Sequence, residues 1–236
     1  MRVVAWVVRL FAAFAAVVLA LVIAFRYIDP PITPLMVIRL VEAAADQRPA
    51  RRDQRWVPLD QVSPRLVRAV VAAEDARFFA HHGVDWEALA DARAHNARHS
   101  GRRVRGAGTI TMQCARNVFL WPGRSYVRKG LEIALAHVLE IIWGKRRILE
   151  VYLNVVEWDD GVYGAEAAAG RHFGIPASAL DDRQAALLAA VLPNPRHWHP
   201  EQPGPYVSAR ASVIERRAAQ VQLPPWLTSE PRGGHR

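Results

Sequence analysis

Residues 70–86 read VVAAEDARFFAHHGVDW, and the folding of this stretch decides how the rest of the chain is interpreted. Just upstream, Ser63-Pro64 provide a cap and a first residue for a helix that we expect to run through residue 76. Glu74 then lies at the end of a helix made mostly of valine and alanine, a setting that suits a general base. Asp75 points elsewhere on that helix, so the two acids cannot act as one flanking pair. A glutamate at a helix end is also a common surface residue, so this stretch needs support from the rest of the chain.

Helical periodicity continues on both sides of this stretch, which predicts a mainly α fold. No internal repeat and no series of alternating strands is visible. The composition, 51% hydrophobic and 22% charged, is typical of a globular protein. The single cysteine, Cys114, excludes an intrachain disulfide framework and a multi-cysteine metal site. We expect helices over residues 35–45, 64–76, 84–98, 109–119, 125–143, 145–155, 164–172, 183–191 and 206–220.

The amino-terminal segment, residues 1–28, predicts a transmembrane signal-anchor. Its apolar run extends from Leu10 to Phe25 and, with the flank before Arg9, reaches the roughly 20 residues that cross a bilayer. Arg2 and Arg9 favour a cytoplasmic amino terminus, whereas Arg26 weakens that preference. The alternative is a cleaved signal peptide, but no clear cleavage site with a polar continuation follows the run. We therefore divide the chain into an anchor (1–28), a connector (29–55), a main domain (56–222) and a disordered tail (223–236).

Positive charge is concentrated in residues 98–147, which hold eleven lysines and arginines and two acids. The net charge of this stretch is therefore +9, the same as that of the whole chain. Such a surface attracts phosphate groups, whether in nucleic acid, lipid headgroups or a pyrophosphate substrate. The alternative is a solvated surface without a ligand. No aromatic residues alternate with these arginines in the manner of a nucleic-acid-binding surface. Nucleic acid would also leave the anchor and Glu74 unexplained, so we do not predict it as a partner.

Two further stretches contain candidate binding residues. Arg128, Lys129 and Glu132 share one helical face, which suits either a surface ion-pair trio or a phosphate site whose carboxylate holds a divalent ion. Arg116 and Arg124 would extend that site. The small-residue loop GAGTITMQ at 106–113 lets backbone N–H groups and a helix N-terminus approach an anion, although it is not a P-loop.

Taken in order, these stretches strongly resemble the motifs of the peptidoglycan glycosyltransferases of glycosyltransferase family 51. EDARFFAHHG fits E-D-x-x-F-x-x-H-x-G, and GAGTITMQ resembles G-G-S-T-I-T-Q-Q. RKGLE fits R-K-x-x-E, and KRRILEVYLN fits K-x-x-I-L-E-x-Y-L-N. NVFLWPGRSYVRKGLE, WDDGVYGAEAAAGRHFG and AALLAAVLPNP look like the monofunctional, membrane-anchored branch. The resemblance extends from about Trp56 to Trp198.

The resemblance implies a lysozyme-like, mainly helical glycosyltransferase domain that polymerises lipid II and releases undecaprenyl pyrophosphate. It implies a bacterial inner-membrane protein with one membrane pass, a cytoplasmic amino terminus and a periplasmic catalytic domain. Lipid II, the growing glycan strand, the membrane and other cell-wall synthesis or division proteins are the expected partners. By motif, Glu74 is the general base, and Glu132 assists the leaving pyrophosphate directly or through a divalent ion, Mg²⁺ or Mn²⁺. The expected substrate-binding residues are Asp75, Phe78, Thr109, Gln113, Arg116, Arg124, Arg128, Lys129 and Lys145.

The sequence departs from the family pattern at Ala107, Gly108, Met112 and Arg116, where the family commonly has Gly, Ser, Gln and Lys. These changes remove a hydroxyl and an amide and alter the geometry of one cation, so we expect weakened or rearranged donor contacts. Two alternative functions stay open. One is a lysozyme-like enzyme that cleaves peptidoglycan, although a carboxylate among cations, such as Glu132, is poorly suited to act as an acid. The other is a non-catalytic membrane scaffold that binds lipid II.

Overall fold

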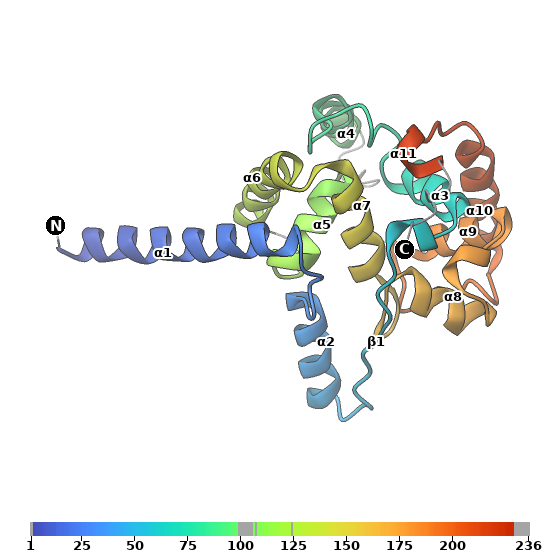
Figure 1. Cartoon of the computed structure of the whole chain (residues 1–236), viewed down its shortest axis with the longest axis horizontal. Helices are drawn as coiled ribbons and strands as arrows, with labels where there is room; N and C mark the ends of the chain where they lie inside the picture. Colours follow the sequence, from blue (N-terminus) through green and yellow to red (C-terminus); the bar gives the residue numbers. More distant parts are fainter. Residues whose placement is uncertain (1, 99–105, 107, 124, 229–236) are drawn as a thin grey trace, which may run out of the picture.

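The computed structural model describes residues 2–98, 106, 108–123 and 125–228 (Figure 1). Helices dominate, which confirms the mainly α prediction. In chain order the α-helices are α1 (Arg2–Phe25), α2 (Pro34–Ala45), α3 (Pro64–Glu74), α4 (Trp86–Arg98), α5 (Ile110–Phe119), α6 (Tyr126–Ile142), α7 (Gly144–Val155), α8 (Ala165–Phe173), α9 (Asp182–Val191), α10 (Pro205–Ala218) and α11 (Pro225–Thr228). Two short 3₁₀ helices span Leu59–Gln61 and Ala177–Ala179.

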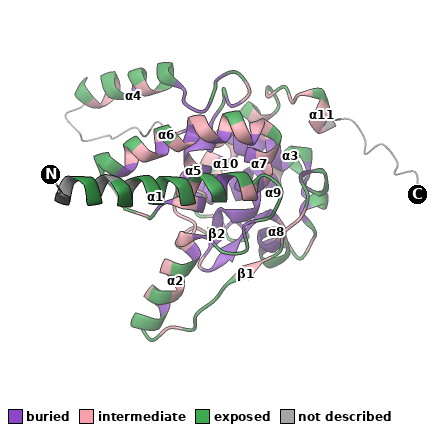
Figure 2. Ribbon diagram, turned by 60° about the vertical axis from the view of Figure 1, so that its left-hand side comes forward, coloured by how far each residue is buried: buried purple, intermediate pink, exposed green. Residues whose placement is uncertain are grey.

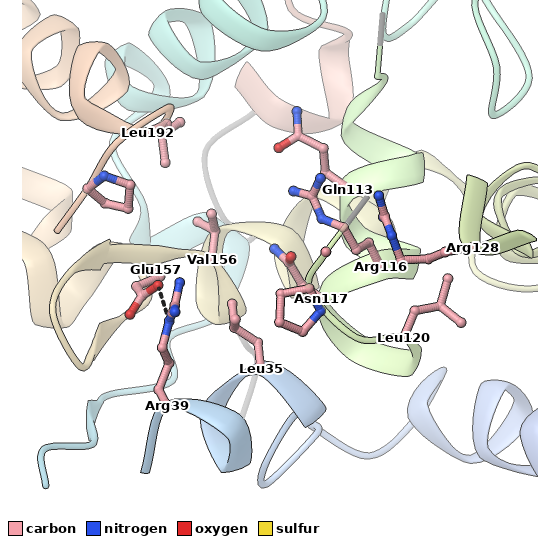
Figure 3. A pocket seen from close by; sticks show the side chains of 13 residues that line it. Leu35, Arg39, Gln113, Arg116, Asn117, Leu120, Arg128, Val156, Glu157 and Leu192 are labelled. Carbon is pink, nitrogen blue, oxygen red and sulfur yellow. Dashed lines mark hydrogen bonds and ion pairs between the residues drawn. The ribbon is translucent and has the colours of Figure 1, made fainter. Parts of the chain in front are cut away.

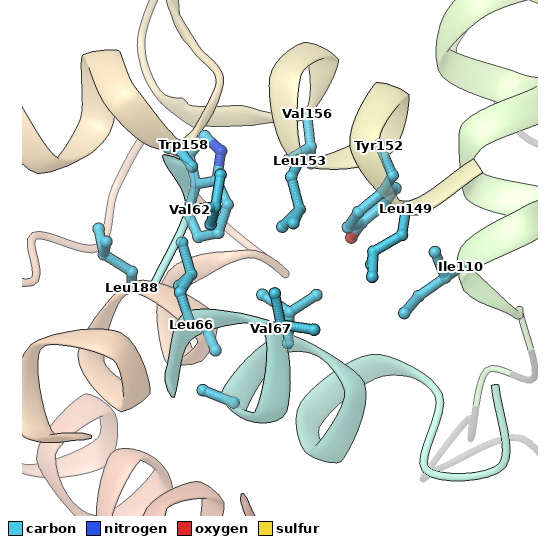
Figure 4. Close-up of a cluster of buried hydrophobic side chains, with 14 of the residues drawn as sticks. Val62, Leu66, Val67, Ile110, Leu149, Tyr152, Leu153, Val156, Trp158 and Leu188 are labelled. Carbon is cyan, nitrogen blue, oxygen red and sulfur yellow. The ribbon is translucent and has the colours of Figure 1, made fainter. Parts of the chain in front are cut away.

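Helix α3 lies at the centre of one half of the domain, where it packs against α9 and α10. The Ser63 side chain accepts a hydrogen bond from the backbone N–H of Arg65, and Pro64 follows as the first residue, as the sequence predicts. Apolar side chains of α3, including Leu66 and Val67, are completely buried and meet residues of α7 and α9 (Figure 4). Burial of each such side chain contributes about 1.5–3 kcal/mol to folding. This packing fixes the helix whose last residue is Glu74.

Helix α3 ends at Glu74, two residues earlier than the sequence predicts. Asp75 leaves the helix with φ −161° and ψ 74°, because its carboxylate caps another element. One oxygen accepts a hydrogen bond from the backbone N–H of Ile110, at the start of α5, with a length of 2.9 Å. The Asp75 carboxylate can reach α5 only if the chain leaves the helix here, so the chain turns at residue 75 where helix was predicted.

The other half of the domain is formed by α5, which packs against both α6 and α7. The turn before α4 passes close to α6 at Gly83, whose φ is +87°. A Cβ atom at this position would lie 2.9 Å from the carbonyl oxygen of Ala136. The carbonyl of Gly83 also accepts a 2.6 Å hydrogen bond from the Thr109 hydroxyl. Gly83 therefore lets the turn after Glu74 pack against α6 and bind the residue that precedes α5.

A small sheet, which the sequence analysis did not predict, completes the domain. Strand β1 (Asp53–Gln54) runs parallel to β3 (Val162–Tyr163), and β2 (Glu157–Asp159) runs antiparallel to β3, in the order β1-β3-β2. Strands of two or three residues are too short to display the alternating pattern by which strands are recognised. The sheet connects the segment before α3 to the segment after α7.

Helix α1 extends away from the domain, and its surface is largely exposed (Figures 1 and 2). Its last turns contact the junction between α6 and α7. Trp143 donates from its indole nitrogen to the carbonyl of Val22 at 2.7 Å, and Arg147 donates to the carbonyls of Phe25 and Ile28 at 3.0 Å each. Within the described part of the chain, which omits several α1 side chains, no helix is both long and apolar enough to cross a membrane.

The predicted disordered tail, residues 223–236, contains helix α11. Trp226 packs edge-on against Phe79, with ring centroids 6.1 Å apart, and its carbonyl accepts a hydrogen bond from Arg146 at 3.1 Å. These contacts order the first part of the tail. Residues 229–236 lie outside the described residues.

Candidate active site

Glu74 lines a pocket of about 280 Å³ formed between the end of α3, the α4 segment and the start of α5. Its side chain is 15% exposed. The Gln113 side-chain amide donates to Glu74 Oε2 at 2.8 Å, and Arg210 Nη2 lies 3.8 Å from Oε1. The described residues donate no hydrogen bond to Oε1. Among the described residues, Oε2 is therefore held by a hydrogen bond, whereas Oε1 has only the Arg210 charge beside it.

Asp75, which the sequence analysis included among the substrate-binding residues, has internal partners. Its side chain is 3% exposed, and His81 Nε2 lies 3.0 Å from each carboxylate oxygen. One of these oxygens also accepts the backbone N–H of Ile110. Asp75 therefore secures the turn that carries Glu74 against the start of α5.

A second pocket, of about 440 Å³, is lined by Gln113, Arg116 and Arg128, and we call it the arginine pocket (Figure 3). Gln113, Arg116 and Asn117 project into it from α5, and Arg128 joins them from α6. Burial lowers the pKa of Arg116, although the nearby groups of Tyr152 and Glu74 oppose that shift. The hydrogen bond between Gln113 and Glu74 thus connects the two pockets.

Arg128, Lys129 and Glu132 form the cluster on α6 that their spacing predicts. The Glu132 side chain is 3% exposed and pairs with the guanidinium of Arg128 and with Lys129 Nζ, the latter at 3.4 Å. Burial and the nearby charge of Arg116 lower the pKa of Arg128. Burial and the nearby charges of Arg116 and Arg128 lower the pKa of Lys129. Arg128 Nε is buried without a hydrogen-bond partner among the described residues. The cations therefore exceed the single carboxylate available to them, and an anion would be favoured here.

Three other predicted substrate-binding residues have architectural contacts. Phe78 is completely buried, and Lys145 Nζ lies 4.4 Å from the centroid of its ring. Lys145 also donates to Glu140 at 2.7 Å. Thr109 caps α5 by accepting the backbone N–H of Met112 at 3.1 Å, and it lines the pocket beside Glu74. Arg124 lies outside the described residues.

Among the described residues, no group of three or more His, Cys, Asp or Glu side chains is arranged to hold a metal ion. Glu132 alone would serve as the protein ligand for the predicted divalent ion. Both oxygens of Glu132 already pair with Arg128 and Lys129, so substrate phosphates would have to supply further ligands and offset the local positive charge, as they do in many Mg²⁺ sites. A phosphate-bearing ligand in the neighbouring pocket would have to complete the coordination.

Comparison with known proteins identifies the chain. A family model described as Transglycosylase matches residues 41–219. The chain belongs to this transglycosylase family. It is 54% identical over 211 residues to a protein of Rhodospirillum centenum, covering 89% of this chain and 88% of that protein. It is 50% identical over 213 residues to a protein of Caulobacter vibrioides, covering 90% of each, and 50% identical over 208 residues to one of Pseudomonas fluorescens, covering 88% and 86%. Each relative is named a biosynthetic peptidoglycan transglycosylase.

This transglycosylase match confirms the resemblance inferred from the motifs and extends it. The match begins at residue 41, inside α2, whereas the motifs suggested a start near Trp56. Arg39, on the same helix, lines the arginine pocket and donates to Glu157 at 3.1 Å. This pair lies across the pocket from Gln113 and Arg116 (Figure 3). The helix predicted as a connector is therefore a wall of the candidate site.

Sequence reasoning missed four site residues: Arg39, Asn117, Glu157 and Arg210. Asn117 follows Gln113 by four residues, so helical spacing was a usable signal that both face the same side. Arg39 and Arg210 come from α2 and α10, outside the region that the motifs cover, and Glu157 lies between two of the motifs without belonging to either. Their proximity arises from tertiary packing, and no local pattern indicates it.

Proposed function

We propose that the chain is a peptidoglycan glycosyltransferase that polymerises lipid II into glycan strands. The observation that carries this proposal is the bridge between Glu74 and the arginine pocket through Gln113. A base with an open oxygen and a site suited to a pyrophosphate are thereby joined by one side chain. Membership of the transglycosylase family supports the same activity and a location in the cell envelope.

In the proposed reaction, the pocket beside Glu74 holds the incoming lipid II, and the arginine pocket holds the pyrophosphate end of the growing strand. Glu74 Oε1 takes the proton of the 4-hydroxyl of the incoming sugar. The hydroxyl oxygen then forms a bond to C1 of the growing strand, and the bond from C1 to the pyrophosphate oxygen breaks. Undecaprenyl pyrophosphate leaves with the electron pair of that bond. General-base assistance of this kind contributes about 100- to 10,000-fold to rate.

Arg116, Arg128 and Lys129 stabilise the charge that develops on the departing pyrophosphate. Because these cations stabilise the leaving group electrostatically, it need not be protonated by a general acid. Glu132 orients Arg128 and Lys129 through its two ion pairs. We also propose a divalent ion, Mg²⁺ or Mn²⁺, held by Glu132 and by pyrophosphate oxygens; such an ion neutralises phosphate charge when bound.

We further propose that α1 anchors the enzyme in the inner membrane with its amino terminus in the cytoplasm and the catalytic domain in the periplasm. At 24 residues, α1 is roughly 36 Å long, comparable with the ~30 Å hydrocarbon core. Large apolar side chains along it are exposed, including Trp6, Leu10 and Phe14 at 62%, 67% and 58%. Contact with other cell-wall synthesis or division proteins would couple polymerisation to cross-linking.

Purified full-length chain incubated with lipid II and Mg²⁺ tests the proposal, with Glu74→Gln as the matched variant. We expect polymeric glycan from the parent and almost none from the variant. Full polymerisation by Glu74→Gln would exclude Glu74 as the base. Shortening of added glycan strands would instead support the lysozyme-like alternative, and lipid II binding without product would support the scaffold.

A further inference from the structure

Two residues with no assigned role in the reaction lie beside Glu74 or its hydrogen-bond partner Gln113. Tyr152, on α7, approaches Glu74 through Gln113, and Arg210, on α10, approaches it directly. We propose that Tyr152 and Arg210 are positioning residues that hold the Glu74 carboxylate in one orientation, with Oε2 fixed and Oε1 presented to the acceptor hydroxyl. This inference rests on the proposed function, because it assigns the roles relative to Glu74 as the base.

The Tyr152 side of this arrangement depends on the direction of two hydrogen bonds. The Tyr152 hydroxyl donates to Gln113 Oε1 at 3.3 Å, and Gln113 Nε2 donates to Glu74 Oε2 at 2.8 Å. A side-chain amide presents an acceptor on one end and a donor on the other. If the amide rotated by a half turn, its oxygen would face the Glu74 carboxylate and its nitrogen would face the tyrosine proton. Because a carboxylate accepts and a phenol can either donate or accept, Glu74 sets the amide orientation, and the Tyr152 hydroxyl stabilises it by donating to the amide oxygen.

The environment of Tyr152 keeps it in the donating form. The side chain is completely buried, and burial together with the nearby Glu74 charge raises its pKa well above the usual range. The phenol consequently remains protonated over the pH range in which an enzyme works. Its ring packs in the core with Leu149 and Leu153 (Figure 4), so the hydroxyl has a fixed position.

Arg210 acts on the other carboxylate oxygen. Its Nη2 lies 3.8 Å from Glu74 Oε1, beyond ordinary hydrogen-bond length, so a positive charge stands beside this oxygen without occupying it. The Nε of Arg210 is buried and has no hydrogen-bond partner among the described residues. The guanidinium therefore places a positive charge beside Oε1, and at 3.8 Å it leaves that oxygen available to the acceptor hydroxyl.

The experiment compares Tyr152→Phe with Tyr163→Phe in the full-length enzyme, measuring kcat and KM for lipid II together with thermal unfolding. Tyr163 is a matched control because its hydroxyl is also buried but has no hydrogen-bond partner among the described residues. We expect Tyr152→Phe to lower kcat about tenfold with little change in KM, as expected for loss of one orienting hydrogen bond. Tyr163→Phe should stay within about twofold of the parent, since it removes no such bond.

Arg210→Gln and Arg210→Lys test the second residue. Arg210→Gln should lower kcat about tenfold, and Arg210→Lys should restore most of that loss because it returns a positive charge beside Oε1. A parent-like kcat in folded Tyr152→Phe or in folded Arg210→Gln would overturn the inference, as would equal losses in both tyrosine variants. Failure of the proposed function would look different, because the parent would then make no glycan or Glu74→Gln would be fully active.

Discussion

Glu74 and Glu132 have different surroundings: a neutral amide and a pocket around Glu74, and two paired cations around Glu132. Glu74 meets one neutral amide at hydrogen-bond distance and one arginine at 3.8 Å, and it opens into a pocket. Glu132, only 3% exposed, is paired with two cations on its own helix. A carboxylate with an open oxygen can accept a proton, whereas one engaged by cations is held in its ionised form. The chemical role of each glutamate therefore depends more on the groups around its carboxylate than on its residue type.

Glu74→Gln should have the largest effect on turnover. The substitution keeps the shape of the side chain but removes the proton acceptor, so we expect kcat to fall by about 1,000-fold, within the range of general-base catalysis. Gel analysis of glycan made from labelled lipid II would measure the loss. The thermal unfolding midpoint should stay near that of the parent, and a loss that merely followed unfolding would contradict the interpretation.

Glu132→Gln should have the second-largest effect and a different character. Removing this charge leaves Arg128 and Lys129 without their carboxylate, so we expect kcat to fall by about 100-fold, as after loss of a preorganised electrostatic group. Stability should also fall, by about 3 kcal/mol, because a buried pair loses one partner. Denaturant unfolding with and without added pyrophosphate would measure this. A variant as stable as the parent would show that the pairing is unimportant to the fold.

Lys129→Arg should change the pH dependence of activity more than its magnitude near pH 7. Burial and neighbouring cations lower the pKa of Lys129, so it loses its charge at a lower pH than an ordinary lysine, whose pKa is 10.5. Activity that needs this cation is present below the lowered pKa and is lost as pH rises through it. Arginine stays charged, so the alkaline limb of kcat/KM should move to higher pH while activity near pH 7 changes by less than about threefold. Superimposable alkaline limbs for the two enzymes would argue against a role for this charge.

Gly83→Ala should have the smallest effect on turnover, because Gly83 contributes to packing and contacts neither glutamate. Its main effect should be on stability. A Cβ at φ +87° would meet the Ala136 carbonyl at 2.9 Å, which we expect to lower stability by about 1–3 kcal/mol. At a temperature where the variant is folded, its kcat should be close to the parent value. Gly130→Ala is a suitable control, since a Cβ added at this position would meet nothing within 4 Å. Equal thermal midpoints for the two variants would contradict the packing argument.

The helices and the family were accessible to sequence reasoning because they depend on local patterns. Ser63 and Pro64 start α3 as their residue types predict, and the Arg128, Lys129 and Glu132 cluster forms at helical spacing. The end of α3 was predicted too late because the reason lies 35 residues away, in the hydrogen bond from Ile110 to Asp75. The small sheet was missed because its strands are too short to show alternation.

Local sequence patterns were sufficient to predict the mainly helical fold, the transglycosylase family and the candidate roles of Glu74 and Glu132. Motif order and helical periodicity carry that information, since both are written in neighbouring residues. The groups around Glu74 could be found only from the folded chain, because Gln113 and Arg210 reach it from two different helices and Tyr152, on a third, contacts Gln113. Hydrogen-bond direction and burial set the state of a carboxylate, and those arise when distant segments pack together.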